Sequence, residues 1–419
     1  RSRASTRAAR VEAEARAARV EALERFRQEA DVTLGATTRN RVGTLVGGAW
    51  GAGLVRFSPE DGGFRTWSLP DNRIYVVNAD DPDEIRVGTW GGGLHVLEPA
   101  TGAVRSYRAT KALGALPHDV VYSIHEDASG ELWIGTNGGG IARIDRTRRS
   151  FSAWAANPAD PAALPDGKIL SIHVDSRRWL WVSVYGNGVH ALAPGAAAWR
   201  HFRHDPDDPT SIGDDTCNLV YEDSEGTIWI ATNRGLSRLA DRERGRFETL
   251  KSPTDGSDGL ADSIVYAVLE DGEGGYWIGT YLRGLDRWDP RTGKFEHYAY
   301  DPGDPRSIPD NLVNTLAYDA KGRLWVGTNN GLARFEDGEF VRYAYSIDDP
   351  SGISNNSIQR IFLDSRGVLW MTTRGGGLMR YEEDEDRFTH YMRKDGLPNN
   401  IVYSVLEDRS GDLWIVTQT

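Results

Sequence analysis

Short runs of alternating apolar and polar residues follow one another along the chain from residue 44 to its end. In one stretch they read "VVYSIHED", "ELWIGT", "GGIARID" and "SFSAW". A period of two, with β-branched and aromatic residues at the apolar positions, is typical of strands. The pattern therefore predicts an all-β body. Each group of four runs supplies four strands, named here a, b, c and d in chain order.

The groups recur with a nearly constant period. They align on the small residue near the end of strand b, and the steps between these residues are 40, 47, 48, 48, 48, 48, 45 and 44 residues. The aligned positions are Gly48, Gly88, Gly135, Ser183, Ala231, Gly279, Gly327, Thr372 and Val416. A period of 40 to 50 residues with four antiparallel strands per unit predicts a β-propeller blade.

The spacing of residues that recurs from unit to unit indicates how the strands are joined. An Asp-x-x-Gly phrase between strands a and b favours a tight turn, and a glycine run between b and c favours a tight hairpin. Asp175 departs from the phrase, because Arg178 stands at its fourth position. The tryptophan of strand b is expected to fill the space between neighbouring blades; these residues are Trp133, Trp181, Trp229, Trp277, Trp325, Trp370 and Trp414.

The number of blades is seven or eight. Eight a strands can be counted, and b strands number eight with a doubtful ninth at 44–49. The N-terminal unit lacks a convincing strand a, whereas the C-terminal unit lacks c and d. These halves could complete one blade and close an eight-bladed ring. Alternatively, the chain covers seven blades and part of a second ring. The propeller is assigned to residues 44–419.

Residues 1–32 are different in character. They are rich in Ala, Arg and Glu and contain no Gly or Pro, which predicts a short helix with charges of both signs. Its apolar face is thin, so it is either a solvated end or a signalling helix that could support a homodimer. Eight arginines and five glutamates give residues 1–30 a charge of +3, so the rest carries −15 of the total of −12. An acidic body argues against a nucleic-acid partner.

The phrases "DASGELWIGTNGGGIARID", "DAKGRLWVGTNNGLARF" and "DRSGDLWIVT" resemble the two-component regulator propeller repeat of bacterial sensor proteins. The loops "ANPADPAALPDG", "DPDDPTSIGDD" and "DPGDPRSIPDN" do so as well. The resemblance implies a periplasmic or otherwise extracytoplasmic sensor domain that recognises a small molecule, often an oligosaccharide. It also implies a membrane segment and an output kinase or cyclase outside this chain. The degraded N-terminal repeat and the lack of an output domain depart from the family.

Strand parity predicts which face binds the ligand. The b–c hairpins and the long d–a loops share one face, and variable loops on a rigid scaffold commonly carry recognition. The residue after the Gly-Thr step is aromatic, amide or Arg, a set suited to stacking on sugars and bonding to hydroxyls. The alternative is ordinary hairpin chemistry. The candidates are Trp50, Trp90, Asn137, Tyr185, Asn233, Tyr281, Asn329 and Arg374, with Gln418 last in the series.

A second series stands just before strand a and would surround the mouth of the central channel if strand a is innermost. Its members are Asn72, Asp119, Gly167, Asp215, Ser263, Asn311, Asn356 and Asn400. The alternative is that they cap the loops through bonds to the backbone. Arg73 and Lys168 follow one place later and are the candidate cations of this mouth.

No catalytic constellation is evident. No histidines recur at metal-ligand spacing, no cofactor is expected, and Cys217 is assigned to the core. The Asp-x-x-Gly spacing differs from that of a sialidase Asp box. The sequence therefore predicts a non-enzymatic ligand-binding sensor domain. The alternatives are a protein-interaction platform and, less favoured, a propeller lyase or glycosidase.

Overall fold

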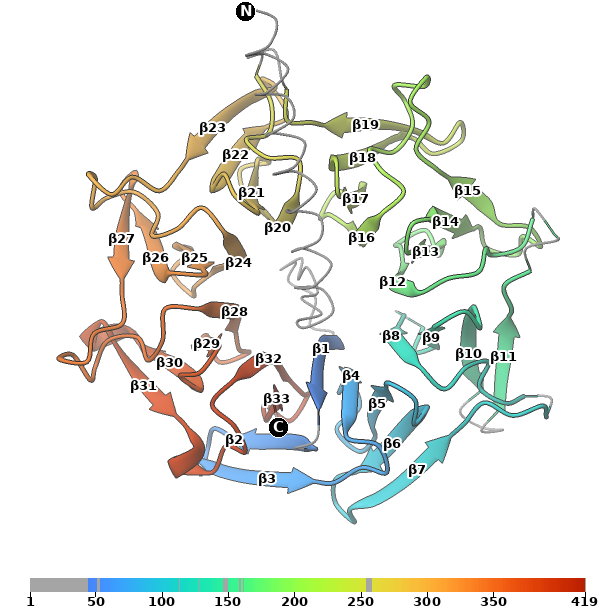
Figure 1. Ribbon diagram of the computed structural model, residues 1–419, viewed down its shortest axis with the longest axis horizontal. Coiled ribbons are helices and arrows are strands. Elements are labelled where there is room, and N and C mark those ends of the chain that lie inside the picture. Colours follow the sequence, from blue (N-terminus) through green and yellow to red (C-terminus); the bar gives the residue numbers. More distant parts are fainter. Residues whose placement is uncertain are drawn as a thin grey trace, which may run out of the picture.

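A computed structural model describes residues 44–50, 53–112, 114–127, 129–145, 150–157, 160, 162–253 and 258–418 of the chain. The expected helix in residues 1–32 lies outside them. The described strands form eight sheets arranged as a closed ring around a central channel (Figure 1). The predicted all-β propeller is therefore confirmed, and its blades number eight.

The first sheet has five strands and the next three have four. Blade 1 contains β1 (Thr44–Trp50), β4 (Arg73–Asn78), β5 (Ile85–Thr89), β6 (Leu94–Glu98) and β7 (Ala103–Tyr107). Blade 2 contains β8 (Val121–Glu126), β9 (Leu132–Thr136), β10 (Ile141–Asp145) and β11 (Ser150–Trp154). Blade 3 contains β12 (Ile169–Val174), β13 (Leu180–Val184), β14 (Gly188–Leu192) and β15 (Arg200–Phe202). Blade 4 contains β16 (Cys217–Glu222), β17 (Ile228–Thr232), β18 (Gly235–Asp241) and β19 (Arg246–Leu250).

The remaining four sheets each have four strands. Blade 5 contains β20 (Val265–Glu270), β21 (Tyr276–Thr280), β22 (Leu285–Asp289) and β23 (Lys294–Tyr298). Blade 6 contains β24 (Val313–Tyr318), β25 (Leu324–Thr328), β26 (Gly331–Glu336) and β27 (Glu339–Tyr343). Blade 7 contains β28 (Ile358–Leu363), β29 (Leu369–Thr373), β30 (Leu378–Glu382) and β31 (Arg387–Tyr391). Blade 8 contains β32 (Val402–Glu407), β33 (Leu413–Thr417), β2 (Leu54–Ser58) and β3 (Gly63–Trp67).

Two short 3₁₀ turns, η1 (Glu383–Glu385) and η2 (Arg393–Asp395), flank β31. Among the described residues no helix is long and apolar enough to cross a membrane.

Blade 8 joins the two ends of the propeller. The C-terminal strands β32 and β33 form its inner half, and the N-terminal strands β2 and β3 form its outer half. In the β2–β33 pair, Val55 lies opposite Ile415 and Phe57 opposite Leu413. The incomplete terminal units of the sequence therefore complete one blade, and the alternative of a partial second ring is wrong.

Strand β1 is not the strand b of a ninth unit. It pairs antiparallel with β4, the innermost strand of blade 1, with Leu45 opposite Val77 and Trp50 opposite Arg73. The following strand β2 pairs with β33 instead, so β1 and β2 form no b–c hairpin. The doubtful ninth strand is therefore an extra strand on the channel side of blade 1 (Figure 1).

The tryptophans of strand b form the cores between blades. All seven have at most 8% of their surface exposed. Trp181 of blade 3, for example, packs with Val220 and Ile230 of blade 4. Burial of such large side chains supplies much of the hydrophobic stabilisation of the ring. The expected role of these residues is confirmed.

Arg86 occupies the tryptophan position in blade 1 and is 2% exposed. Its guanidinium lies 3.3 Å from Asp81 and 3.3 Å from Glu126, and it donates to the Oδ1 of Asn78. Because Glu126 belongs to β8, an ion pair joins blades 1 and 2 where tryptophan joins the others.

Glycine is required at two kinds of position. A Cβ on Gly135 would lie 2.5 Å from a methyl carbon of Ile169 in the next blade, so the small residue allows close approach. Gly140 has a φ of +78°, and a Cβ there would lie 2.2 Å from the carbonyl oxygen of Trp154. Only glycine fits this hairpin without moving strand d.

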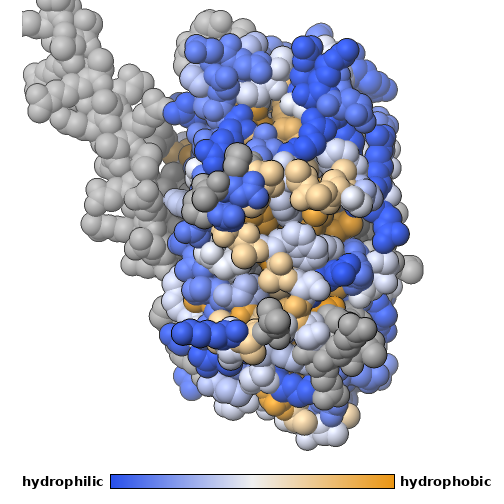
Figure 2. Space-filling view, turned by 90° about the vertical axis from the view of Figure 1, so that its right-hand side faces the viewer, coloured by the Kyte–Doolittle hydropathy of each residue, from blue (hydrophilic) through white to orange (hydrophobic). Residues whose placement is uncertain are grey.

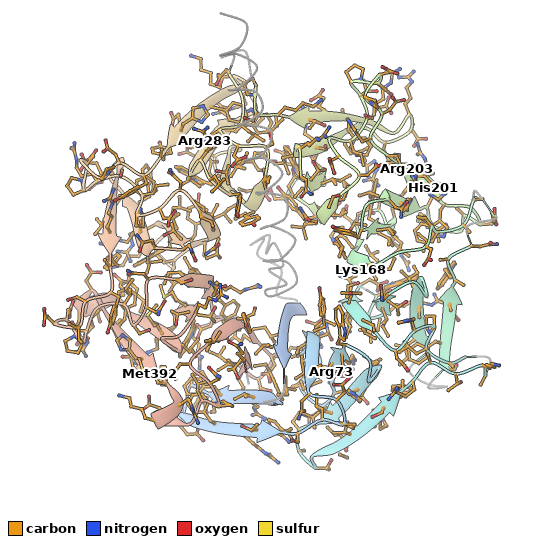
Figure 3. The ribbon with its side chains drawn as sticks, viewed as in Figure 1. Arg73, Lys168, His201, Arg203, Arg283 and Met392 are labelled. Atoms are coloured by element: carbon orange, nitrogen blue, oxygen red, sulfur yellow. The ribbon has the colours of Figure 1, made fainter. Side chains whose placement is uncertain are left out.

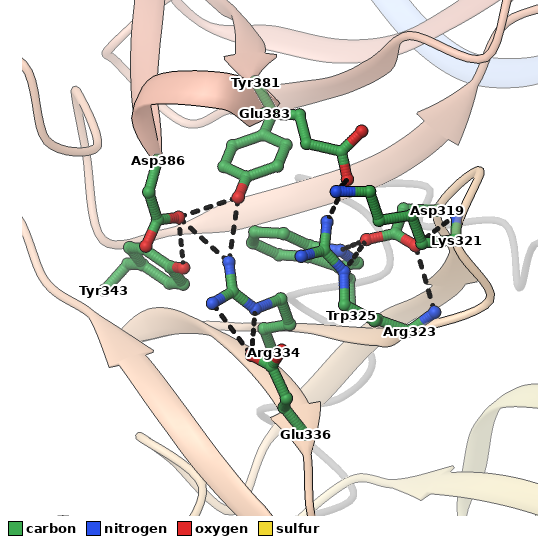
Figure 4. A network of polar contacts seen from close by, with 10 residues as sticks. All are labelled: Asp319, Lys321, Arg323, Trp325, Arg334, Glu336, Tyr343, Tyr381, Glu383 and Asp386. Carbon is green, nitrogen blue, oxygen red and sulfur yellow. Dashed lines mark hydrogen bonds and ion pairs between the residues drawn. The ribbon is translucent and has the colours of Figure 1, made fainter.

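Polar networks reinforce the outer part of the ring. Between blades 6 and 7, Arg334 donates to the hydroxyl of Tyr381 and to Asp386, while Arg323 bridges Asp319 and Glu383 (Figure 4). The side of the ring that carries β11 and β15 is mostly hydrophilic, with small apolar patches between polar side chains (Figure 2).

Candidate functional site

One face of the ring is built from the b–c hairpins and the ends of the d–a loops. In each blade, the residue after the Gly-Thr step donates its backbone N–H to the carbonyl of the residue just before strand a. These pairs are Trp90–Arg73, Asn137–Val120, Tyr185–Lys168, Asn233–Thr216, Tyr281–Ile264, Asn329–Leu312, Arg374–Ser357 and Gln418–Ile401. The hairpin and the start of the innermost strand are therefore held together eight times.

Backbone hydrogen bonds also join neighbouring blades on this face. A glycine of the b–c hairpin donates to the carbonyl of the second series in the next blade. The pairs are Gly93–Asp119, Gly138–Gly167, Gly188–Asp215, Gly235–Ser263, Gly284–Asn311, Gly331–Asn356 and Gly377–Asn400. The two series singled out in the sequence thus lie side by side around the mouth of the channel.

The side chains of the second series mainly cap the d–a loops. Asp215 accepts the N–H of His204 at 2.7 Å, and Asn311 accepts that of Tyr300 at 2.7 Å. The same bond is made by Asn72, Asp119, Asn356 and Asn400 to Leu69, Ala109, Tyr345 and Arg393. Of the two alternatives, loop capping is therefore the role that these six side chains have.

The structure adds a third series that sequence reasoning missed. Strand a of every blade has a register shift near its start, after the second residue in β4 and after the first residue in the other seven, which marks a β-bulge. The bulged residues are Tyr75, Tyr122, Leu170, Asn218, Tyr266, Asn314, Gln359 and Tyr403. This column of aromatic and amide residues is visible when the repeats are aligned, and its composition matches that of the series after Gly-Thr.

Blades 1 to 3 carry a continuous aromatic group, here called the aromatic arc: Tyr75, Trp90, Tyr122, Lys168 and Tyr185. The ring of Tyr122 lies 4.6 Å from that of Tyr75 and 5.6 Å from that of Trp90. The Nζ of Lys168 lies 5.8 Å from the ring centre of Tyr122 and 5.7 Å from that of Tyr185. Figure 3 places Lys168 beside the channel. Tyr185 is 37% exposed, so the arc offers an open aromatic surface.

Blades 4, 6 and 7 present amides instead. Asn218 donates to the Oδ1 of Asn233 at 3.2 Å. Gln359 donates to the Oγ of Ser357, which donates to the Oδ1 of Asn329, each at 3.0 Å. These contacts join the series after Gly-Thr to the bulged series, both within one blade and between blades 6 and 7. The amide arc, as it is called here, consists of Asn218, Asn233, Asn329, Ser357 and Gln359.

The remaining candidates complete the mouth. Tyr281 packs against Tyr266, with ring centres 5.3 Å apart. Asn137 is half-buried and forms a β-bridge with Lys168 in the next blade. The structure therefore brings Trp90, Asn137, Tyr185, Asn233, Tyr281, Asn329 and Arg374 to one face.

Cations at the mouth differ in their surroundings. Arg73 forms a bidentate pair with Asp71 at 2.9 Å, and this hydrogen bond raises the pKa of Arg73. Arg374 is exposed and lies near Tyr403, where burial raises the pKa of the tyrosine and the arginine partly offsets that effect. Arg73 therefore has little net charge to offer a ligand, because Asp71 neutralises it.

Trp50 was expected in a b–c hairpin like the other candidates, and this placement is wrong. Its backbone ends β1 opposite Arg73, at the same face but on the channel side of blade 1. The cause is the pairing of β1 with β4, which removes the hairpin that the repeat pattern predicts.

Among the described residues no group of three His, Cys, Asp or Glu side chains could hold a metal ion. Cys217 is fully buried, its Sγ donates to the carbonyl of Asp214, and burial raises the pKa of its thiol. The mouth thus combines flat rings, amides and a few cations, a surface that can stack on apolar faces and bond hydroxyls.

The sequence matches the model of the two component regulator propeller family in six segments. They are residues 115–138, 211–234, 259–282, 307–330, 352–375 and 396–419. The first five segments run from the end of a d–a loop through strands a and b into the b–c hairpin, and the sixth covers β32 and β33 of blade 8. No curated protein matches the sequence.

Among solved structures, the chain is similar to the extracellular domain assigned to the hybrid two-component system BT3049 of B. thetaiotaomicron, at 19% identity and a TM-score of 0.38. That match covers 93% of this chain and 55% of the other. BT4673 of the same organism gives 20% identity and a TM-score of 0.37, covering 89% and 57%. The chain thus spans little more than half the length of these two.

The computationally designed protein Ika8 matches with a TM-score of 0.54 at 10% identity, covering 86% of this chain and 96% of that one. At these identities the likenesses show the fold alone.

Proposed function

Because this chain belongs to the two-component regulator propeller repeat family, we propose that it is the ligand-binding sensor domain of a bacterial signal-transduction protein. The proposed ligand is an oligosaccharide or another small polar molecule. It would bind at the mouth formed by the b–c hairpins and d–a loops. As is usual in this family, we place the domain outside the cytoplasm.

The aromatic arc is the observation that carries the proposal. A half-exposed tyrosine with a cation over its ring, next to a tryptophan and two buried tyrosines, presents apolar rings beside a polar rim. Pyranose rings have apolar faces that stack on such surfaces, and their hydroxyls bond amides like those of the amide arc. An extended saccharide could contact both arcs across the mouth.

Binding without turnover fits the chemistry of the mouth. Three carboxylates at the mouth are engaged with protein groups: Asp71 pairs with Arg73, Asp119 pairs with Arg108 and accepts a loop N–H, and Asp215 accepts the N–H of His204. We propose that the ligand selects one arrangement of the ring relative to the segment that follows it, and that this shift is the signal.

The first test is to screen purified protein against an oligosaccharide array and to titrate the best ligand by calorimetry. Tyr185→Ala and Tyr281→Ala should each weaken binding by about 1–2 kcal/mol, the scale of one aromatic contact. Tyr345→Ala is the matched control, because Tyr345 is exposed on a d–a loop and belongs neither to the series after Gly-Thr nor to the bulged series. Circular dichroism should show that all three variants stay folded.

Two outcomes would contradict the proposal. Loss of saccharide binding in Tyr345→Ala but not in the other variants would show that the ligand binds at the d–a loop of Tyr345 and not at the b–c hairpins. A cleaved saccharide after prolonged incubation with pure protein would indicate an enzyme instead of a sensor.

A further inference from the structure

A loop in blade 6 binds a guanidinium group, and that group belongs to the chain itself. The loop over residues 301–307 accepts hydrogen bonds from Arg342 of β27 through three backbone carbonyls. Nε donates to the carbonyl of Ser307 at 2.5 Å, and Nη2 donates to those of Asp301 and Asp304 at 3.1 and 2.8 Å. Nη2 also contacts the Oγ of Ser307, and the guanidinium lies 5.3 Å from the ring centre of Tyr300.

The loop over residues 205–211, between blades 3 and 4, has the same internal hydrogen bonds. Asp205 N–H donates to the Oγ of Ser211 at 3.0 Å, as Asp301 does to Ser307 at 2.8 Å. Ser211 N–H donates to the carbonyl of Asp208 at 3.1 Å, as in the Ser307–Asp304 pair at 3.2 Å.

Both loops are also anchored in the same way. Thr210 accepts the N–H of Phe247 on β19, and Arg306 accepts that of Phe340 on β27. The carbonyls of Asp205, Asp208 and Ser211 therefore correspond to the three that hold Arg342.

The two loops differ in the side chain that strand d places beside them. The residue two places after Phe340 is Arg342, whereas the residue two places after Phe247 is Thr249. The hydroxyl of Thr249 bonds that of Ser237 at 2.9 Å and is too short to reach the loop. In blade 7 the equivalent residue is His390, whose Nε2 bonds the carbonyl of Gly352 at 2.7 Å. Strand d of blade 6 thus supplies a guanidinium to the loop beside it, and strand d of blade 7 supplies an imidazole nitrogen. Strand d of blade 4 supplies neither group.

A cavity of about 440 Å³ lies at this loop. It is lined by Asp205, Asp208 and Ser211 from the loop, by Phe247 from β19, and by His204 and Arg203 before the loop. His204 occupies the position in this loop that Tyr300 has in the other, and its Nδ1 bonds the carbonyl of Ile212 at 2.8 Å. Figure 3 places Arg203 farther from the channel than Lys168.

We propose that the 205–211 loop is a binding site for an external guanidinium group. The group would donate to the carbonyls of Asp205, Asp208 and Ser211 as Arg342 donates in blade 6. The loop carries three aspartates, and the guanidinium of Arg203 beside it is directed to Asn187 at 2.8 Å. Hydrogen bonds from Thr210 lower the pKa of the Asp208 carboxyl and the nearby Arg246 lowers it further, so the backbone carbonyls and not net charge are the basis of the site. The fork of a guanidinium fits several carbonyls at once, which an ammonium does not.

The experiment uses the whole chain and N-acetyl-arginine amide as the probe, followed by NMR or calorimetry. We expect saturable binding at one site. N-acetyl-citrulline amide, the neutral analogue of the same shape, should bind at least tenfold more weakly. A Gly-Gly-Arg-Gly-Gly peptide is titrated in the same way. Tighter binding of the peptide than of N-acetyl-arginine amide indicates a peptide arginine as the natural ligand, and weaker binding indicates a small guanidinium compound.

Variants in both loops make the test specific. Thr249→Arg should place a guanidinium on the three carbonyls, as Arg342 does in blade 6, and weaken probe binding at least tenfold, while Thr249→Val, which adds no guanidinium, should leave it unchanged. Arg342→Ala should vacate the blade 6 loop, so that the probe binds at two sites and restores part of the lost thermal stability. If Thr249→Arg does not fold, the Arg342→Ala arm still decides.

Three outcomes would contradict the guanidinium site, and none of them bears on the sensor proposal. Equal binding of the citrulline analogue, full binding in Thr249→Arg, or no binding in either the wild type or Arg342→Ala would overturn the site. The loop would then hold only water. Saccharide binding is tested through Tyr185 and Tyr281, which do not line this cavity, and is scored in a separate titration.

Discussion

The aspartate of the a–b turn in blade 4 links three parts of the structure. In blade 4, the Oδ1 of Asp223 accepts the N–H groups of Glu225 and Thr227, which closes the turn. Its Oδ2 accepts Trp229 Nε1 and the hydroxyl of Tyr276 from blade 5, both at 2.7 Å. The buried indole and phenol are thereby satisfied, and a residue chosen for its turn also joins two blades.

Another buried residue makes stability depend on pH. His190 is fully buried, and its Nδ1 lies 2.7 Å from that of His201. Burial lowers the pKa of His190 to about 3. The unfolded chain binds a proton on this imidazole below about pH 6.5, whereas the folded protein does not. Stability from this residue is therefore complete above pH 6.5 and is lost as pH falls toward 3.

We expect His190→Asn to remove this dependence. Between pH 6 and pH 4, the wild type should lose about 1.4 kcal/mol per pH unit more than the variant. Urea unfolding of both proteins across the range measures the difference, and the many carboxylates common to both cancel. Parallel curves would show that His190 is already protonated in the folded state.

At the scale of elements, two N-terminal strands have opposite importance. β2 completes blade 8, and its Leu54, Val55 and Phe57 are fully buried. Phe57 packs on Trp370 and Tyr391 of blade 7, with ring centres 5.8 and 4.8 Å away. β1, by contrast, adds a fifth strand on the channel side of β4, where it also lies beside β32, β33 and β8. Ring closure therefore depends on β2 and β3.

Two truncations test this difference. A chain of residues 51–419 lacks β1 and should keep one cooperative thermal transition near that of the full chain. A chain of residues 68–419 also lacks β2 and β3. Each large buried side chain lost is worth about 1.5–3 kcal/mol, against a typical net stability of about 5–15 kcal/mol. The shorter chain should not form a closed ring at 37 °C, and equal transitions by calorimetry would refute this account.

The same elements show what could be read from the sequence. The period, the turns and Trp229 with its counterparts predicted the blades, because each unit repeats the same local pattern. The partner of β1 could not be predicted, since backbone pairing carries no sequence signal and β1 resembles any strand b. The bulge at Tyr122 was missed for a related reason, because it arises only when strands a and b pair.

The candidate site divides in the same way. The alternating direction of the strands within a blade, together with the lengths of the loops, identified the face that carries Tyr185 and Tyr281. The contact of Trp90 with Tyr122 could not be predicted, because it joins blades through the register of two bulged strands. The loop-capping role of Asp215 and its counterparts was one of two alternatives that only geometry could separate.

At the scale of the whole molecule, the mouth is a series of hydrogen bonds that crosses seven blade boundaries, from blade 1 to blade 8. Gly235 N–H, for example, bonds the carbonyl of Ser263 in the next blade at 2.7 Å. A ligand that tightens one hairpin therefore acts on the loop beside it, and that loop holds the following hairpin. Such a chain of contacts can couple binding on one arc to order on the other.

This coupling predicts the pattern of amide protection. With a saturating saccharide found by the array, hydrogen exchange should slow in the b–c hairpins of blades 4, 6 and 7 as well as in those of blades 1 to 3. Amides of the a–b turns on the opposite face should change little and serve as the internal control. Mass spectrometry of peptic fragments resolves these segments. Protection confined to the aromatic arc would mean that each blade responds alone, and the signal would then have to leave through the blades that touch the ligand.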